Sequence, residues 1–259
     1  MEQLSLEMLM FVLAGGFFAA YVDAVVGGGG LIAVPVLLAT GMPPALVLGT
    51  NKLAGTMGSL TSTISFIRSG HVELKTGLRL FPLSLIGAVA GTFVLQQIPS
   101  DFLRPLVVFM LIGITVYTIF RRSWGSRSSF AGFTRKSAVL IGAAALALGF
   151  YDGFFGPGTG SFLLFAFLLL GFDFVRAAGN AKVLNFGSNL ASLATFIALG
   201  SVHYGIGLSM GAAMILGSWL GSRMAIRKGS VYVRPLFLTV CALLIGKQLW
   251  ELFQSFVGP

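Results

Sequence analysis

Long apolar stretches recur along the whole chain and restrict what it can fold into. Four of them cover residues 78–96, 103–120, 136–151 and 204–223. About 20 consecutive apolar residues cross the hydrocarbon core of a bilayer as one helix. Charged residues make up only 10% of the chain, and its mean hydropathy is +0.93. The sequence therefore predicts an all-α polytopic membrane protein with about eight transmembrane passes.

The chain also contains an internal repeat. Aligned residues keep an offset of 129, and then of 130 after one inserted residue near Gly160. Because the matches form an ordered set at nearly constant spacing, we predict two homologous halves in a single membrane domain, residues 1–130 and 131–259. The aligned pairs include DAVVGGGG at 23–30 with DGFFGPGT at 152–159, Lys52 with Lys182, Gly87-x-x-x-Gly91 with Gly217-x-x-x-Gly221, and Arg104-Pro105 with Arg234-Pro235.

Each half is predicted to contain a helix broken at glycines, a short apolar piece, a longer polar-spotted helix and two ordinary spans. The short pieces cannot cross a bilayer at 1.5 Å per residue, so we interpret them as half-helices or re-entrant pieces. The predicted ranges are 8–26, 31–40, 43–67, 78–96 and 103–120 in the first half, and 136–151, 161–171, 174–199, 204–226 and 231–255 in the second.

The distribution of Lys and Arg predicts the orientation in the membrane. Basic segments stay in the cytoplasm, and placing all of them there requires an odd number of crossings in each half. The halves would then be inverted, with both termini on the outer side. Four spans per half would instead give parallel halves and leave one basic cluster outside. The basic clusters are Arg68, Lys75 and Arg79; Arg121, Arg122, Arg127, Arg135 and Lys136; and Arg223, Arg227, Lys228 and Arg234.

Several functional classes are excluded. The net charge of +9 arises from cations at the ends of apolar segments, so we expect a lipid bilayer and no nucleic acid as partner. The single cysteine, Cys241, cannot form an internal disulfide, and His71 and His203 are too isolated for a metal site. No Walker A, G-x-S-x-G or H-E-x-x-H motif occurs, so we predict no enzyme and no cofactor.

Two glycine-rich interruptions at matching positions are the first candidate site feature. They cover residues 27–30 and 156–160. Glycine lets the backbone turn and approach a ligand closely, and the amides beyond a break suit an anion. Close helix packing also explains a glycine run, but two repeat-related breaks favour binding. The candidates are Gly28, Gly29, Gly30, Gly158 and Thr159.

Polar residues on two long helices are the second feature. Asn185, Ser188 and Asn189 fall on one helix face, which must contact protein or a water-filled cavity. An ionised lysine at the membrane centre costs about 2.5–3.5 kcal/mol, so Lys52 and Lys182 are functional candidates. Snorkelling from a helix end explains the two lysines equally well. The candidates are Thr50, Asn51, Lys52, Asn180, Lys182, Asn185, Ser188 and Asn189.

Asp23 and Asp152 precede the two breaks by about one turn. They either form ion pairs with the lysines or take up protons during transport. A carboxylate that only pairs a buried lysine satisfies the energetics, so charge pairing and proton coupling both stay open. The two G-x-x-x-G motifs are expected to pack helices within the chain, with a homodimer as the alternative.

Four motifs carry a resemblance to a known family: DAVVGGGGL at 23–31, TNKL at 50–53, GFYDGFFGP at 149–157 and AKVLN at 181–185. With them the chain resembles the sulfite exporter TauE/SafE family, also called the toluene sulfonate uptake permease family, and within it the YfcA-like members. The resemblance covers essentially the whole chain. It implies a secondary transporter of small sulfur-containing anions (sulfite, sulfonate or sulfoacetate) in the bacterial cytoplasmic (inner) membrane, coupled to protons.

The residues agree with a compact oxyanion as ligand. Its oxygens would accept hydrogen bonds from Asn189, Ser188 and Thr50, while Lys52 and Lys182 offset its charge. Because the second half is richer in Asn and Ser, we expect an asymmetric site. Two alternatives stay open: a channel or permease for another small anion or solute, and a non-transporting membrane scaffold.

Overall fold

A computed structural model of the protein describes residues 5–95, 128–130, 132, 134–239, 242, 246 and 250. Within these residues the regular secondary structure is helical, as the sequence predicts. Outside the described residues lie the predicted span 103–120, most of the predicted span 231–255, Cys241 and the cations from Arg121 to Arg127. The helices are α1 (Leu6–Val26), α2 (Gly30–Leu38), α3 (Pro44–Arg68), α4 (Leu74–Leu95), α6 (Arg135–Phe154), α7 (Thr159–Leu169), α8 (Phe174–Ala198) and α9 (Tyr204–Lys228), and residues 230–239 are also helical.

In the part of the chain that the structure describes, four helices are long and apolar enough to cross a membrane: α1, α4, α6 and α9. Large apolar side chains such as Phe18, Leu78, Val139 and Leu216 are exposed on their outer faces, where lipid would surround them. The central helices α3 and α8 are also long enough to cross a membrane, with 25 residues each, but they carry many polar side chains. Most of the polar side chains of α8 are buried against other helices, which removes the cost of exposing them to lipid.

Both G-x-x-x-G motifs pack helices inside the chain, as predicted. A Cβ added at Gly87 would lie 2.2 Å from the carbonyl oxygen of Leu146 on α6. A Cβ added at Gly217 would lie 2.2 Å from the carbonyl oxygen of Phe17 on α1. The missing side chains therefore let α4 approach α6, and α9 approach α1, with their backbones in contact.

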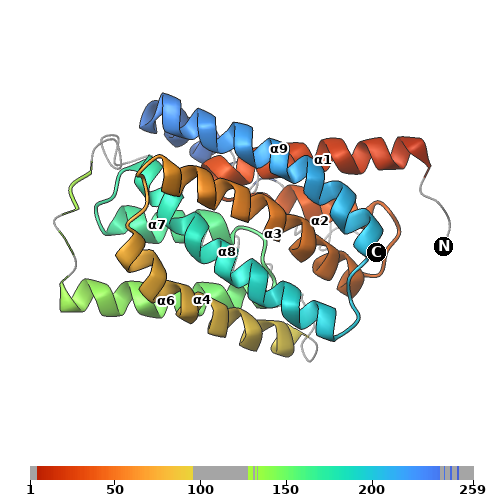
Figure 1. The fold of residues 1–259 in the computed structure, drawn as a ribbon, viewed down its shortest axis with the longest axis horizontal. Helices are drawn as coiled ribbons and strands as arrows, with labels where there is room; N and C mark the ends of the chain where they lie inside the picture. Colours follow the sequence, from red (N-terminus) through yellow and green to blue (C-terminus); the bar gives the residue numbers. More distant parts are fainter. Residues whose placement is uncertain are drawn as a thin grey trace.

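The contacts along these helix pairs determine the relative directions of the outer helices. Gly91, one turn after Gly87, faces Phe150, one turn after Leu146, so α4 and α6 run parallel. By the same test Gly221 faces Tyr21, so α9 and α1 also run parallel. The α1–α9 pair lies on one side of the bundle and the α4–α6 pair on the other, with α3 and α8 between them (Figure 1).

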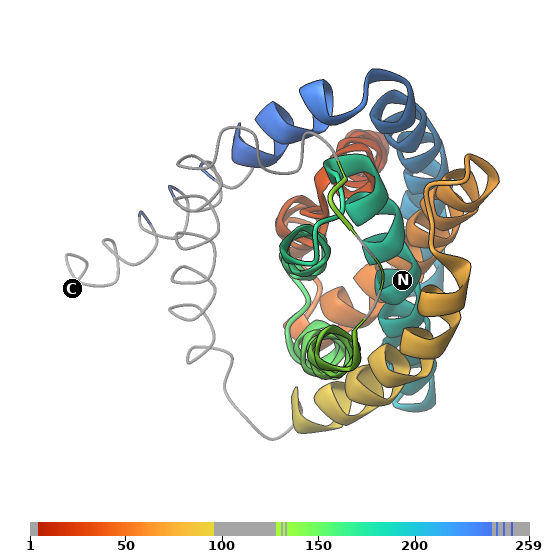
Figure 2. The ribbon, with the colours of Figure 1, turned by 90° about the vertical axis from the view of Figure 1, so that its left-hand side faces the viewer.

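The central helices α3 and α8 run antiparallel. Gly55 faces Asn189, whereas Thr63, further along α3, donates to the carbonyl oxygen of Lys182, which comes earlier in α8. Helix α9 runs parallel to α3, and α4 runs parallel to α8. Consequently α1, α3 and α9 run in one direction along the bundle, and α4, α6 and α8 run in the opposite direction. Figure 2 shows the bundle with its long axis pointing toward the viewer.

Candidate functional site

The two glycine breaks meet inside the bundle. Gly27 ends α1 in the left-handed conformation, with a φ of 76°. Its carbonyl oxygen accepts hydrogen bonds of 2.8 Å from both the backbone N–H and the hydroxyl of Ser161 in α7. A Cβ at Gly27 would lie 2.1 Å from the carbonyl carbon of Gly160. Only residues without side chains allow the backbones of the two halves to touch here.

The half-helices begin directly after these breaks. Helix α2 has 9 residues and is preceded by Gly29, whose N–H donates to the Oδ1 of Asp23 at 3.2 Å. Helix α7 has 11 residues and follows Gly158, which adopts a left-handed conformation with a φ of 89°. Free N–H groups and the helix dipole give both N-termini a positive partial charge. The two N-termini therefore bring positive potential to the region where the breaks meet.

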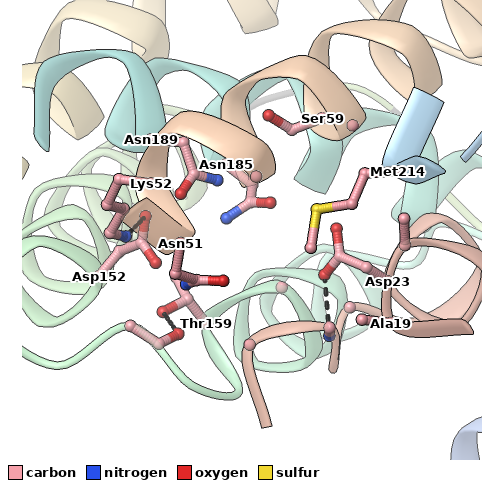
Figure 3. A pocket seen from close by; sticks show the side chains of 18 of the residues that line it. Ala19, Asp23, Asn51, Lys52, Ser59, Asp152, Thr159, Asn185, Asn189 and Met214 are labelled. Carbon is pink, nitrogen blue, oxygen red and sulfur yellow. Dashed lines mark hydrogen bonds and ion pairs between the residues drawn. The ribbon is translucent and has the colours of Figure 1, made fainter. Parts of the chain in front are cut away.

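A cavity lies between these breaks and the central helices (Figure 3). Its empty volume, including space that is continuous with solvent, is about 510 Å³. The first half lines it with Ala19, Ala20, Asp23, Gly27, Gly29, Gly30, Asn51, Lys52, Gly55, Gly58 and Ser59, and the second half with Asp152, Gly156, Gly158, Thr159, Gly160, Asn185, Asn189, Met214 and Ser218.

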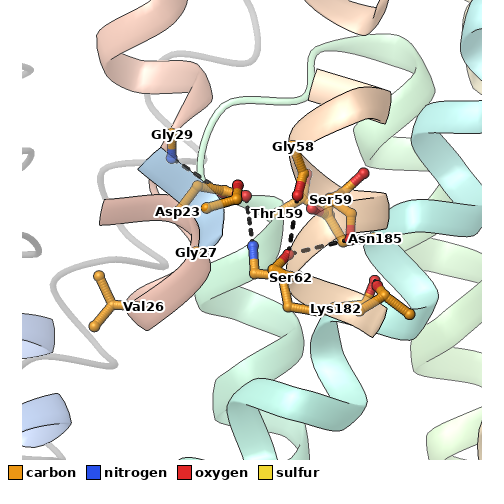
Figure 4. A network of polar contacts seen from close by, with 12 residues as sticks. Asp23, Val26, Gly27, Gly29, Gly58, Ser59, Ser62, Thr159, Lys182 and Asn185 are labelled. Atoms are coloured by element: carbon orange, nitrogen blue, oxygen red, sulfur yellow. Dashed lines mark hydrogen bonds and ion pairs between the residues drawn. The ribbon is translucent and has the colours of Figure 1, made fainter. Parts of the chain in front are cut away.

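Two ion pairs cross between the halves. Lys52 Nζ lies 3.0 Å from Asp152 Oδ2, and the two side chains are 5% and 3% exposed. Lys182 Nζ lies 2.6 Å from Asp23 Oδ2, with side chains that are 2% and 22% exposed (Figure 4). The lysines are thus buried and end on carboxylates inside the bundle, so they do not snorkel to the surface. Each half supplies the counter-ion of the other, and the four charges cancel.

Three asparagine side chains line the cavity without a partner. The amides of Asn51, Asn185 and Asn189 make no hydrogen bond to any described residue. Asn185 and Asn189 are buried. Buried amides in proteins normally pair with protein or with water, because leaving one unpaired is costly. Together they give the cavity wall three unused NH2 donors, which is the chemistry that recognises oxyanions.

Thr50 and Asn180 were predicted to bind substrate, but they make structural hydrogen bonds away from the cavity. The hydroxyl of Thr50 accepts from the backbone N–H of His203, which precedes α9, at 3.0 Å. The amide oxygen of Asn180 accepts from the backbone N–H of Glu73, which precedes α4, also at 3.0 Å. Each of these repeat-related residues therefore holds the start of a helix in the other half, Thr50 that of α9 and Asn180 that of α4.

Gly28, Lys182 and Ser188 also do not line the cavity. The hydroxyl of Ser188 donates to the carbonyl oxygen of Asn185 in its own helix at 3.1 Å. Lys182 contributes through its ion pair with Asp23, which does line the cavity. The predicted residues that do line it are Asp23, Gly29, Gly30, Asn51, Lys52, Asp152, Gly158, Thr159, Asn185 and Asn189.

Some cavity residues were not predicted from the sequence. Met214 and Ser218 lie one turn apart on α9, and Ala19 and Ala20 lie on α1. Both helices have the hydropathy of ordinary spans, so small or apolar residues on them give no local signal. A weak signal existed only for Ser218, which directly follows the packing glycine Gly217.

Comparison with known proteins gives matches over nearly the whole chain. A family model described as "Sulfite exporter TauE/SafE" matches residues 12–247. A probable membrane transporter protein, ORF9, from Sinorhizobium sp. is 39% identical over 245 residues, 93% of this chain and 92% of that protein. A probable membrane transporter protein of Haemophilus influenzae is 38% identical over 250 residues, with coverage of 96% and 97%. The probable membrane transporter protein YfcA of Escherichia coli is 36% identical over 249 residues, with coverage of 96% and 91%. No solved structure matches the chain.

Proposed function

Since the chain belongs to the sulfite exporter TauE/SafE family and is a membrane transporter rather than an enzyme, we propose that it carries a small sulfur-containing anion across the cytoplasmic membrane. The observation that carries this proposal is the cavity at the meeting point of the glycine breaks. It combines two half-helix N-termini, unpaired amides and a buried lysine. Broken helices from two repeats that meet around a site within the membrane are typical of secondary transporters.

The anion would bind among donors from both halves. Asn51, Asn185 and Asn189 supply NH2 groups, and Gly30 and Gly160, at the starts of α2 and α7, supply backbone N–H groups. Lys52 adds a positive charge that is already partly offset by Asp152 at 3.0 Å. We assign binding to these residues together with Gly158, while Gly29 and Thr159 form part of the cavity wall with donors that already bond to Asp23 and Gly156. Thr50 and Asn180 are assigned to the scaffold, because their hydrogen-bonding groups are already in use.

The charge balance of the cavity favours a singly charged substrate. Lys52 with Asp152, and Lys182 with Asp23, form two neutral pairs, and the cavity lining contains no other ionisable side chain. A dianion would enter this site without compensation, and the cost of transferring an ion from water rises steeply with its charge. Hydrogensulfite or a sulfonate is therefore preferred over sulfate.

We further infer that the halves are inverted repeats in the membrane. The two helices of each repeat-related pair run in opposite directions. These pairs are α1 with α6, α3 with α8, and α4 with α9. Apart from Lys52 and Lys182, the described cations lie at or near the end of the bundle where α3 and α9 finish. The positive-inside rule then predicts that this end lies in the cytoplasm and the start of α1 outside, as expected for inverted halves with an odd number of crossings in each. The cations are Arg68, Lys75, Arg79, Arg135, Lys136, Arg176, Arg223, Arg227, Lys228 and Arg234.

We propose that the carboxylate of Asp23 couples proton movement to transport. It faces the cavity and is more exposed than Asp152, and its only ionic partner among the described residues is Lys182. The other charged groups facing the cavity are Lys52 and Asp152, which neutralise each other. A proton on Asp23 would leave Lys182 with a net positive charge beside the cavity. Anion binding is then favoured on the side of lower pH.

Flux measurements in proteoliposomes test the proposed function. We expect saturable uptake of radiolabelled sulfite, inhibited by methanesulfonate and only weakly by sulfate, and accelerated by an inward proton gradient. Hydrogensulfite and methanesulfonate are both singly charged and share the oxyanion head, whereas sulfate is a dianion, so the comparison with sulfate tests the preference for a single charge. Flux that rises linearly with concentration would indicate a channel. Absence of flux for every sulfur oxyanion would exclude the proposed substrate class.

Asp23→Asn tests the coupling. The variant removes the titrating group but keeps its size and its ability to accept from Gly29. We expect transport that no longer responds to an imposed pH gradient, while counterflow of labelled against unlabelled anion continues. Asp173→Asn is the matched control, because Asp173 caps α8 and lies outside the cavity. A normal pH response in Asp23→Asn would remove Asp23 from the coupling mechanism.

A further inference from the structure

Ser218 on α9 has a buried hydroxyl without a partner. The residue is 1% exposed, lines the cavity, and its Oγ forms no hydrogen bond to any described residue. Ser222, one turn later, differs because its hydroxyl donates to the carbonyl oxygen of Ser218 at 2.7 Å. A buried hydroxyl that no protein group satisfies is expected to meet water or a ligand.

Ser218 lies in the wall of the cavity, where its buried hydroxyl is next to Gly58. A Cβ added at Gly58 on α3 would lie 3.0 Å from the Ser218 Oγ, so glycine at that position preserves the space beside the hydroxyl. Ser59, the next residue on α3, already donates its hydroxyl to the carbonyl oxygen of Thr56 at 3.2 Å. Ser218 is thus an unused hydroxyl donor on this wall, and α9 carries it into the same cavity as Asn185 on α8.

Helix α4, which corresponds to α9 in the repeat, does not form a similar wall. Ala88 on α4 corresponds to Ser218 and does not line the cavity. Ser84, which corresponds to Met214, donates its hydroxyl to the carbonyl oxygen of Leu184 at 2.8 Å and is fully buried. The α4 side therefore does not reach the cavity and its hydroxyl is in use, whereas the α9 side lines the cavity and the hydroxyl of Ser218 has no partner among the described residues.

We propose that Ser218 donates a hydrogen bond to the transported anion and is a specificity-determining residue. This proposal rests on the proposed function above. The anion then lies off the axis that relates the two halves, between α8 and α9. Its oxygens reach Asn185 and Asn189 on one side and Ser218 on the other. This arrangement favours an oxyanion with acceptor atoms in several directions over a spherical halide.

Ser218→Ala tests the contact, with Ser192→Ala as the matched control. Ser192 has an equally buried and unpartnered hydroxyl but does not line the cavity. We expect Ser218→Ala to raise the half-saturation concentration for radiolabelled sulfite by roughly 10-fold or more, the usual effect of losing a hydrogen bond to a charged group. Ser192→Ala should keep the wild-type value. The amount of folded protein in each proteoliposome preparation normalises the rates.

A thiol at the same position distinguishes direct contact from an indirect effect. Since Cys241 is the chain's single cysteine, Ser218→Cys on a Cys241→Ser background carries one thiol. We expect methanesulfonate, but not chloride, to slow its modification by a small methanethiosulfonate reagent in the intact protein, whereas sulfite is left out of this arm because it reacts with the reagent itself. If wild-type protein transports sulfite, but Ser218→Ala keeps its half-saturation concentration and the thiol is not protected, the role of Ser218 is excluded. If wild-type protein transports no sulfur oxyanion, the proposed function itself fails.

Discussion

Replacing Lys52 by alanine is expected to abolish transport and to lower the free energy of unfolding by about 3–5 kcal/mol. The substitution leaves the Asp152 carboxylate, which is 3% exposed, without its ionic partner. It also removes the cation that lines the cavity where the anion is proposed to bind. Sulfite flux in proteoliposomes and the melting temperature in detergent measure the two effects separately.

Two further variants separate stability from transport at this ion pair. Lys52→Ala/Asp152→Ala removes both charges, so most of the lost stability should return while transport stays absent. Arg176→Ala is the matched control, because Arg176 and Glu73 form an exposed pair at 3.7 Å, with side chains 41% and 43% exposed. Such a pair contributes at most about 1 kcal/mol, and its loss should leave flux intact. Wild-type flux in Lys52→Ala would contradict a role for this lysine.

Gly27→Ala is expected to separate the two glycine breaks and to eliminate transport. The new Cβ would lie 2.1 Å from the carbonyl carbon of Gly160, and the residue would have to keep a left-handed φ of 76°. The conformational strain costs about 1–2 kcal/mol, and overpacking adds about 1–3 kcal/mol. The hydrogen bonds from Ser161 to the Gly27 carbonyl oxygen should weaken as the breaks move apart.

Gly41→Ala isolates the contribution of crowding in this experiment. Gly41 has nearly the same φ, 79°, but a Cβ there would meet no heavy atom within 4 Å. Only the conformational strain remains, so a loss of about 1–2 kcal/mol with full transport is expected. Thermal denaturation and sulfite flux of the two variants, measured side by side, test the difference. Equal effects would show that contact between the breaks is unimportant.

Much of the fold could be predicted because its signals are local. Apolar length indicates a membrane helix, and the breaks after Val26 and Phe154 follow from the glycines and from Pro157. The G-x-x-x-G motifs indicated close packing correctly, since the absence of a side chain is visible in the sequence itself. The repeat then implied that a feature present in one half has a counterpart in the other.

The candidate site was predicted less completely, because helical spacing does not show which neighbour a face meets. Asn185 and Asn189 line the cavity, but Ser188 on the same predicted stripe bonds within its own helix. Thr50 next to Asn51 points to the start of α9 instead of the cavity. Ser218 and Met214 lie on a helix with the composition of an ordinary span, so only its packing against α3 shows that they line the cavity.

The sequence alone determined the class of the protein, its duplication, its glycine breaks and the residue types available for an anion, because hydropathy and backbone freedom belong to the residues themselves. Only the tertiary structure decided that Lys52 pairs with Asp152 and Lys182 with Asp23, each across the halves. It also decided that the cavity opens toward α9 and is closed toward α4. These properties depend on distances between segments 100 or more residues apart, and such distances arise only when the two halves pack together.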